Sequence, residues 1–363
     1  MNLEDIAKRI IAWSEGEPQD PEFIQIYPTN KCNLKCVFCV QKTSLYQQCE
    51  EVSRRRWIEI TKELCSMNIR RMLISGGGEP LATPETTLKI MELIKKCDIE
   101  GRIITNGTLW CEKSIKKTVK MGWDCVVFSI DGIEGVHDFL RGVRGTFQKV
   151  RKNIEIFNKY KKRKKSTKPV LGINFVLTSY NYEHLPKVIE FAGEYGIEDI
   201  NIEPVCVNNP EVEKMKLNKE MRERFFNNEA IEAEKKANEY GIRTNLKKLQ
   251  ELRYIENTGH MRGLILKKMA NENKDIFNVA CFEPWIWPKI EANGEVWPCS
   301  TIEMKENIKE KKFKEVWFGE EFNKFREMVK SGNLPRDCNN CVFSHLYFTK
   351  EIKEKIKKLR SNG

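Results

Sequence analysis

The sequence of 363 residues predicts an α/β fold made of parallel βαβ units, and two observations lead to this prediction. Short, nearly continuous apolar segments recur between residues 23 and 205, and amphipathic segments of helical length separate them. Parallel strands buried on both faces have this apolar character, and crossover helices connect them. The pattern alone fits either an open doubly wound sheet or part of a TIM-type barrel.

Six strands and five intervening helices are predicted in this region. The strands combine β-branched and aromatic residues over four to eight positions, whereas the helices have apolar residues every three or four positions. The predicted strands are 23–28, 70–75, 101–105, 124–130, 170–177 and 198–205. The predicted helices are 53–67, 84–97, 111–121, 147–162 and 182–195.

The chain between residues 210 and 278 is charged and mostly helical in pattern. The run NEAIEAEKKANEYG predicts one long helix that ends at Gly241, because glycine readily adopts the left-handed conformation that caps a helix. A short edge strand near 242–245 and a bridging segment should follow. A further helix is predicted at the N-terminus, within the amphipathic residues 1–17.

Composition and charge exclude several classes of protein. The hydrophobic content of 40% suffices for a buried core, and no apolar run approaches the roughly 20 residues of a membrane helix. Residues 1–17 carry charges throughout and do not resemble a signal peptide, so the 13 cysteines indicate a reducing compartment, the cytoplasm. The net charge of +11 is concentrated at 159–168 and 350–360, but aromatic residues are not interleaved there, so nucleic acid is not an expected partner.

Three cysteines in the run CNLKCVFC are the most informative chemical feature of the chain. Cys32, Cys36 and Cys39 follow the first predicted strand at a four-residue and then a three-residue step. Thiolates at such spacing bind soft metals, above all iron–sulfur clusters. A cubane ligated fully by protein takes four cysteines, so three would leave one iron open to an outside ligand. Zinc is the alternative, and it would need a fourth ligand, for which only Cys49 lies close in sequence.

The CxxxCxxC run closely resembles the signature of the radical S-adenosylmethionine (SAM) superfamily. In that family the open iron chelates the amino and carboxylate groups of SAM. One electron then cleaves SAM, and the resulting 5′-deoxyadenosyl radical takes a hydrogen atom from the substrate. The resemblance implies an incomplete (β/α)6 TIM-type barrel with the [4Fe–4S] cluster at the C-terminal mouth of the strands. It also implies an external one-electron reductant, similar to flavodoxin or ferredoxin.

Several strand ends carry further elements that resemble those of SAM enzymes. The run SGGGEP after the second strand matches the family's GGEP element, which implies that its backbone and Glu79 hold the SAM ammonium. Arg141, in the run HDFLRG, matches an arginine that pairs with the SAM carboxylate, for which a guanidinium is suited. The predicted cofactor-binding residues are Gly76, Gly77, Gly78, Glu79, Asn106, Ser129, Asp131 and Arg141. We expect His137 to be a positioning or surface residue.

A second set of cysteines lies near the C-terminus. Cys281 and Cys299 bracket a predicted hairpin with strands at 285–291 and 295–299 and a turn at Asn293-Gly294, and Cys338 and Cys341 form a CxxC. A helix is predicted between the pairs, at 320–332. Four thiols from a hairpin and a CxxC can close around one metal, and their spacing alone fits a zinc ribbon as well as an iron–sulfur cluster.

This segment resembles the SPASM/twitch extension of radical SAM enzymes. No cysteine follows Cys341, and Tyr347 stands where the longer SPASM pattern has one, so the resemblance implies the shorter twitch form with one auxiliary [4Fe–4S] cluster. The expected domains are an N-terminal helix at 1–21, the partial barrel at 22–245, a helical bridge at 246–278, a twitch domain of hairpin plus helix at 279–348 and a basic C-terminal helix at 349–363.

A cluster ligated by four thiolates has no open position for substrate, so it favours a role as electron acceptor in a net two-electron oxidation. Only 31 residues precede Cys32, too few for a peptide-recognition domain, so we expect a small, sugar- or aminocyclitol-like substrate. The alternatives are a peptide- or protein-modifying maturase and a non-catalytic iron–sulfur electron carrier or sensor. The candidate catalytic residues are Glu203, Cys206 and Arg262, with His260 as a weaker candidate base.

Overall fold

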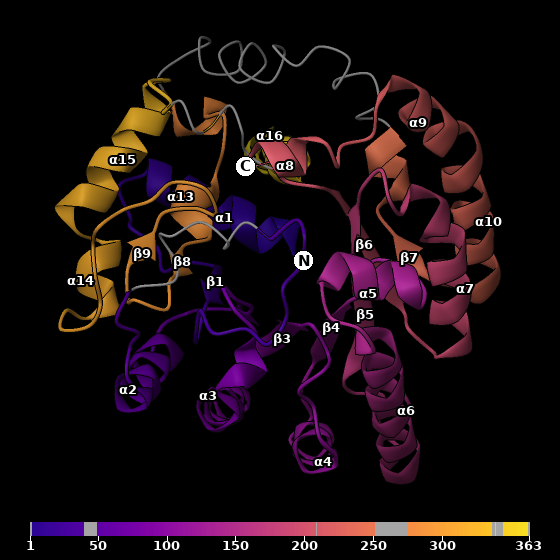
Figure 1. Ribbon diagram of the computed structural model, residues 1–363. Coiled ribbons are helices and arrows are strands. Elements are labelled where there is room, and N and C mark those ends of the chain that lie inside the picture. Colours follow the sequence, from indigo (N-terminus) through magenta and orange to yellow (C-terminus); the bar gives the residue numbers. More distant parts are fainter. Residues whose placement is uncertain are drawn as a thin grey trace. The chain divides into compact units, whose positions relative to one another are not determined.

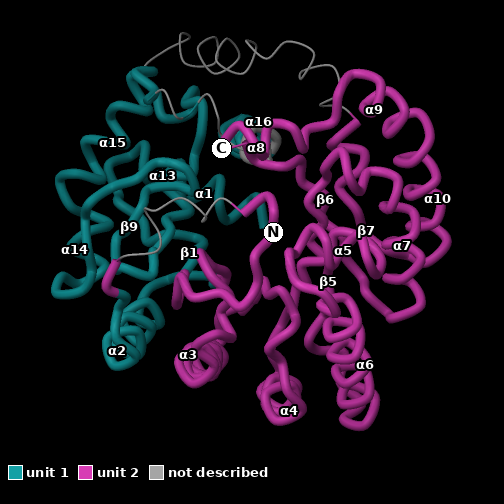
Figure 2. The backbone as a smooth tube through the Cα atoms, viewed as in Figure 1, with its two compact units in different colours: residues 1–26, 51–72, 255–363 teal, residues 27–50, 73–254 magenta. Residues whose placement is uncertain are grey.

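The computed structural model describes residues 2–39, 49–207, 209–250, 275–335, 338 and 344–361, with the side chains described from residue 348 onward in the last segment. The chain forms two compact units, each made of segments distant in sequence (Figure 2). Unit 1 comprises residues 1–26, 51–72 and 255–363, and unit 2 comprises residues 27–50 and 73–254.

Unit 2 contains a row of parallel strands. Strand β2 (Arg71–Ile74) spans the boundary between the units, and the other strands of unit 2 are β3 (Glu100–Thr105), β4 (Cys125–Ser129), β5 (Val170–Leu177), β6 (Asp199–Pro204) and β7 (Arg243–Thr244). From β3 to β7, each strand pairs in parallel with the next. The side chains of Val126, Phe128, Ile173 and Phe175 are buried, as expected for a parallel sheet with covered faces. The predicted α/β class and the edge strand near 242–245 are confirmed.

Helices connect these strands and lie outside the row (Figure 1). The longer ones in unit 2 are α3 (Pro84–Lys96), α4 (Glu112–Lys120), α6 (Thr146–Lys164), α7 (Leu185–Glu194) and α10 (Ala230–Tyr240). Helix α4 packs on α6, and α7 packs on α10. Each of the first four agrees with a predicted helix to within three residues at either end.

The long helix predicted after residue 210 is interrupted in the structure. It consists of α8 (Pro210–Glu213), α9 (Lys219–Arg224), a π-helical turn at Phe225–Glu229 and α10. Asn218 starts α9 anew, because its side chain accepts a hydrogen bond of 2.8 Å from the backbone of Met221. Helix α10 ends at Gly241 with φ of 68°, as predicted.

Unit 1 is built on the N-terminal and C-terminal segments. Its helices are α1 (Leu3–Ser14), α2 (Arg54–Cys65), α13 (Glu283–Ile286), α14 (Phe313–Trp317), α15 (Glu320–Lys330) and α16 (Ser344–Ser361). Helix α1 packs on α16, and Ile6, Ile10, Phe282 and Ile352 belong to the same apolar core. Strand β1 (Phe23–Ile26) pairs in parallel with β8 (Lys289–Ile290).

The predicted C-terminal hairpin is present, but it is shorter than expected. Strand β8 pairs antiparallel with β9 (Val296–Trp297), and Gly294 in the turn has φ of 85°. Residues 285 and 286, predicted in the first strand, lie instead in α13, with Pro284 in its first turn, where proline suits a helix. Among the described residues, no helix is long and apolar enough to cross a membrane.

Candidate functional site

The loop that carries Cys32, Cys36 and Cys39 is fixed to the glycine-rich run on one side. The backbone N–H of Gly78 donates to the carbonyl of Thr29 over 3.0 Å, and that of Glu79 donates to the carbonyl of Lys31 over 2.8 Å. A Cβ at position 78 would collide with the backbone of Lys31. Glycine at this position therefore permits the close approach that brings the cysteine loop to the end of β2.

Helix α5 (Gly135–Arg141) fixes the other side of the loop. The backbone N–H groups of Lys35 and Val37 donate to the carbonyls of Arg141 and Leu140 over 3.2 and 2.9 Å. Gly142 ends α5 with φ of 68°, and a Cβ there would collide with the backbone of Lys35. The sequence run that supplies Arg141 thus also anchors the segment between Cys32 and Cys39.

The sulfur atoms of this loop receive hydrogen bonds. The backbone N–H of Leu34 donates to Cys32 Sγ over 3.5 Å, and Arg141 Nη1 donates to Cys36 Sγ over 3.8 Å. Burial raises the pKa of the Cys32 thiol. Hydrogen bonds to sulfur are a known influence on iron–sulfur clusters, and three thiols on one loop are the donor set that such a cluster requires. The residues therefore fit a cluster, although no three His, Cys, Asp or Glu side chains in the described part of the chain already form a metal site.

Glu79 is almost fully buried, with 2% of its surface exposed. Its Oε1 accepts from Thr105 Oγ1 over 2.6 Å and from the backbone N–H of Leu81 over 3.1 Å, and its Oε2 accepts from the backbone N–H of Asn106 over 2.6 Å. Burial raises the pKa of Glu79, and these hydrogen bonds partly oppose this increase. Glu79 therefore fastens the glycine-rich run to the end of β3 and places Asn106, whose Nδ2 lies 4.0 Å from Cys32 Sγ.

Asp131 and Arg141 form a buried ion pair, with 2.6 Å between Asp131 Oδ2 and Arg141 Nη2. Asp131 Oδ1 accepts from the backbone N–H of Val176 over 2.9 Å, and the backbone carbonyl of Asp131 accepts from Asn181 Nδ2 over 2.8 Å. Burial raises the pKa of Asp131, and the positive charge of Arg141 opposes this effect. The ends of β4 and β5 and helix α5 are thereby joined around one charge pair beside the cysteine loop.

His137 is fully buried beneath this pair. Its Nδ1 accepts from the backbone N–H of Asp131 over 3.2 Å, which requires the neutral ring. Burial lowers its pKa to about 3. The expected positioning role is supported, and a surface position is excluded.

The structure adds two residues to the site that sequence reasoning did not identify, Thr105 and Asn181. Thr105 ends β3 directly before the predicted Asn106, and this place at a strand end was a usable signal. Asn181 lies beyond β5 in a turn without any motif. Of the predicted cofactor-binding residues, Ser129 ends β4 and pairs in register with Asn174.

The predicted catalytic residues are less closely connected to this site. Glu203 and Cys206 are exposed near the end of β6, and Glu203 Oε1 accepts from Asn201 Nδ2 over 2.8 Å. His260 and Arg262 lie outside the described residues. Catalytic roles for these residues remain predictions.

In unit 1, two members of the second cysteine set belong to an apolar core. The buried Cys299 and the partly buried Cys338 belong to the same apolar cluster, together with Phe282. The backbone N–H of Ile302 donates to Cys299 Sγ over 3.3 Å, and that of Glu283 donates to Cys281 Sγ over 3.4 Å. Sulfur atoms that accept backbone hydrogen bonds beside an apolar core fit an iron–sulfur cluster. Cys341 lies outside the described residues.

Comparison with known proteins agrees with both sites. Residues 26–192 match the radical SAM superfamily, and residues 281–342 match the SPASM family, an iron–sulfur cluster-binding domain. The chain therefore carries a radical SAM domain followed by a SPASM domain. Its cofactors are SAM, the [4Fe–4S] cluster of the first domain and auxiliary iron–sulfur chemistry in the second.

Curated relatives match from about half of the chain to nearly all of it. The sporulation killing factor maturation protein SkfB of Bacillus subtilis is 25% identical over 51% of this chain and 46% of its own length. The AdoMet-dependent heme synthase of Methanosarcina barkeri is 23% identical over 93% of this chain and 89% of its own length. The chain spans about half the length of the first curated relatives that it matches.

Solved structures confirm the fold. Streptococcus suis SuiB bound to S-adenosylmethionine matches with a TM-score of 0.64 and 19% identity, over 89% of this chain and 72% of that chain. The same protein bound to precursor peptide SuiA matches with a TM-score of 0.62 and 19% identity, over 89% of this chain and 70% of that chain. The predicted α/β class, with the partial barrel of radical SAM proteins and a small C-terminal domain, is thus confirmed.

Proposed function

We propose that this chain is an enzyme that cleaves SAM reductively and takes a hydrogen atom from a peptide as the first step of a net oxidation. The observation that carries the proposal is the attachment of the cysteine loop to both the glycine-rich run and α5. It brings three thiols, the backbone of Gly78 and Glu79, and the guanidinium of Arg141 together within unit 2. When bound, the cluster and SAM supply the 5′-deoxyadenosyl radical.

The chain's own residues would bind and orient SAM. Backbone carbonyls of the glycine-rich run would accept hydrogen bonds from the ammonium group, and the close packing of Gly78 on the backbone of Lys31 holds this run beside the cysteine loop. Arg141 would offer N–H groups to the carboxylate while Asp131 holds its Nη2. Glu79 would act through Asn106 and the glycine-rich run, because both of its oxygens already accept hydrogen bonds from the fold.

Net oxidation requires that the substrate lose one hydrogen atom, then one electron and one proton. We propose that an auxiliary cluster accepts the electron, and that its ligands are Cys281, Cys299, Cys338 and Cys341. Glu203 remains a candidate for the base that accepts the proton. The first electron would come from a flavodoxin- or ferredoxin-like reductant. The cytoplasm is the compartment that suits these thiols.

A peptide substrate is favoured by the names of relatives, among them a maturation protein and a fold neighbour bound to a precursor peptide. A heme-type tetrapyrrole is the second candidate, because the heme synthase is aligned over 93% of this chain. The expected sugar- or aminocyclitol-like substrate gains no support from these relatives.

The test combines deuterium transfer with a variant of the auxiliary site. Anaerobically reconstituted protein, SAM and dithionite are incubated with perdeuterated peptides or deuterated tetrapyrroles, and 5′-deoxyadenosine is analysed by mass spectrometry. Deuterium transferred from a peptide supports the proposal, whereas transfer from the tetrapyrrole alone favours the second candidate. The absence of SAM cleavage under all conditions would contradict both.

Cys299→Ala tests the electron acceptor. This variant should still form 5′-deoxyadenosine, because the radical-forming residues are elsewhere in sequence, but oxidised product should be lost. Substrate binding must be measured in parallel, because the alternative role of the metal is to hold residues 281–341 in place. If a variant that binds substrate forms as much oxidised product per 5′-deoxyadenosine as wild type, the cluster is not the electron acceptor.

A further inference from the structure

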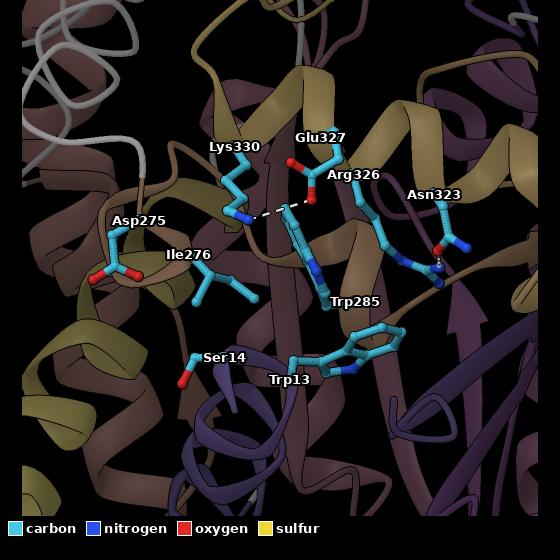
Figure 3. A pocket seen from close by; sticks show the side chains of 9 residues that line it. All are labelled: Trp13, Ser14, Asp275, Ile276, Trp285, Asn323, Arg326, Glu327 and Lys330. Carbon is cyan, nitrogen blue, oxygen red and sulfur yellow. Dashed lines mark hydrogen bonds and ion pairs between the residues drawn. The ribbon is translucent and has the colours of Figure 1, made fainter. Parts of the chain in front are cut away.

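Unit 1 contains a pocket of about 370 Å³ that the proposed reaction does not use (Figure 3). It lies among α1, α13, α15 and the 3₁₀ turn Ile276–Asn278, and no cysteine of the described residues lines it. The lining residues are Trp13, Ser14, Asp275, Ile276, Trp285, Asn323, Arg326, Glu327 and Lys330. Its walls thus combine two indoles with two cationic and two carboxylate side chains.

Arg326 is the unusual member of this wall, because only 3% of its surface is exposed. Its Nε donates to the carbonyl of Pro284 over 2.9 Å, and its Nη1 donates to the carbonyl of Trp317 over 2.9 Å. No carboxylate in the described part of the chain forms an ion pair with it. Burial lowers its pKa to about 9, which leaves the guanidinium charged at neutral pH.

Aromatic rings compensate part of this charge. The guanidinium carbon lies 4.7 Å from the ring centroid of Trp13 and 4.3 Å from that of Trp317. Cation–π contacts of this kind offset only part of the free-energy cost of burying an unpaired charge. The environment of Arg326 therefore favours a further, anionic partner.

Two N–H donors in this wall have no acceptor within the described structure, Arg326 Nη2 and Trp13 Nε1. Figure 3 shows the Arg326 guanidinium beside the Trp13 indole, with Asp275 on the opposite side of the pocket. Asp275 already accepts from the backbone N–H of Phe277 over 3.3 Å. Buried donors without a partner require an explanation, and an unrecorded water or ion is the usual one.

We propose that this pocket binds a carboxylate carried on an aromatic body. Arg326 and Trp13 would donate to its two oxygens, and the indoles of Trp13 and Trp285 would enclose its ring. A carboxylate suits the wall better than water, because it supplies both acceptors and the missing negative charge. Lys330 also lines the pocket, where its charge is balanced by Glu327 over 3.3 Å, so Arg326 supplies the positive charge that a carboxylate would neutralise. This site is additional to the proposed SAM chemistry and does not depend on it.

The test is calorimetric titration of reconstituted, full-length protein with benzoate, with benzamide as the uncharged control. Benzoate should bind with a dissociation constant of about 1 mM or tighter, and benzamide should not bind. Trp13→Phe removes one donor but keeps an aromatic ring beside Arg326, so it should weaken benzoate binding about tenfold. Trp110→Phe is the matched control, because Trp110 Nε1 is also buried without an acceptor but does not line the pocket.

Two sources could supply such a carboxylate, a free aromatic acid or the C-terminal residue of a peptide. N-acetylphenylalanine compared with its amide distinguishes them, since only a site open to a peptide terminus binds the larger acid. Three results would each overturn the proposal: no heat of binding with benzoate up to about 10 mM, binding of benzamide as tight as that of benzoate, or unchanged benzoate affinity in Trp13→Phe. Trp13→Phe decides the question even if substitutions of Arg326 prevent folding.

Discussion

Arg141 and Asp131 form an ion pair of 2.6 Å within unit 2, and the other terminal nitrogen of Arg141 lies 3.8 Å from the sulfur of Cys36. One guanidinium thus joins the buried carboxylate at the end of β4 to the cysteine loop. A residue expected to recognise SAM is also part of the structure that holds the loop. Substitutions at this pair should therefore affect stability as well as cofactor binding.

Asp131→Asn should lower the free energy of unfolding of the apo protein by about 3–5 kcal/mol, because it leaves Arg141 buried without a counter-charge. Urea denaturation of wild type and variant measures the effect. The double variant Asp131→Asn with Arg141→Met should recover part of the loss. Equal loss in the single and double variants would show that the pair itself contributes nothing.

Arg141→Ala should weaken SAM binding by about 1.5–3 kcal/mol, the range for a hydrogen bond to a charged group. Equilibrium binding of SAM to the cluster-loaded protein is the measurement, and iron content confirms that the loop is intact. Arg144→Ala serves as the control, because Arg144 is exposed three residues further along the chain. Wild-type SAM affinity in a folded, loaded Arg141→Ala protein would reject the assignment.

Stability should decrease as pH falls from about 6.5 to about 3, in part because of His137. In this range the unfolded chain binds a proton at His137 and the native protein does not. Lower pH therefore stabilises the unfolded state relative to the native state. The contribution is at most about 1.4 kcal/mol per pH unit. His137→Asn should therefore show a smaller slope of unfolding free energy against pH than wild type, and an identical slope would contradict the buried, neutral assignment.

Anaerobic reconstitution should give about eight iron atoms per chain, which corresponds to two cubanes. Alanine at Cys32, Cys36 and Cys39 together should reduce the iron to about half. During aerobic purification the three-cysteine cluster should be lost first, because one of its irons lacks a thiolate. Saturation of wild type near four iron atoms, with zinc at the second site, would contradict an auxiliary cluster.

Most helices and parallel strands could be predicted from the sequence, because each depends on a local apolar pattern that neighbouring residues display. The cysteine loop, Gly78 and Glu79 were identifiable for the same reason. The bond from Glu79 to Thr105 was not predictable, because it joins two strand ends that are distant in sequence. The ion pair of Asp131 and Arg141 was not predictable either, because it depends on how α5 packs against the end of β4. Asn181 and the pocket beside Arg326 carried no motif at all. The end of α13 was mistaken for a strand, since Trp285 and Ile286 suit either structure.

The most direct test of the account is SAM cleavage by the reconstituted protein. With dithionite under anaerobic conditions, wild type should convert SAM to 5′-deoxyadenosine and methionine, detected by chromatography and mass spectrometry. The variant with alanine at Cys32, Cys36 and Cys39 should form neither. Wild-type protein that holds its iron and binds SAM but yields no 5′-deoxyadenosine, or a triple variant as active as wild type, would contradict the assignment of radical SAM chemistry to this loop.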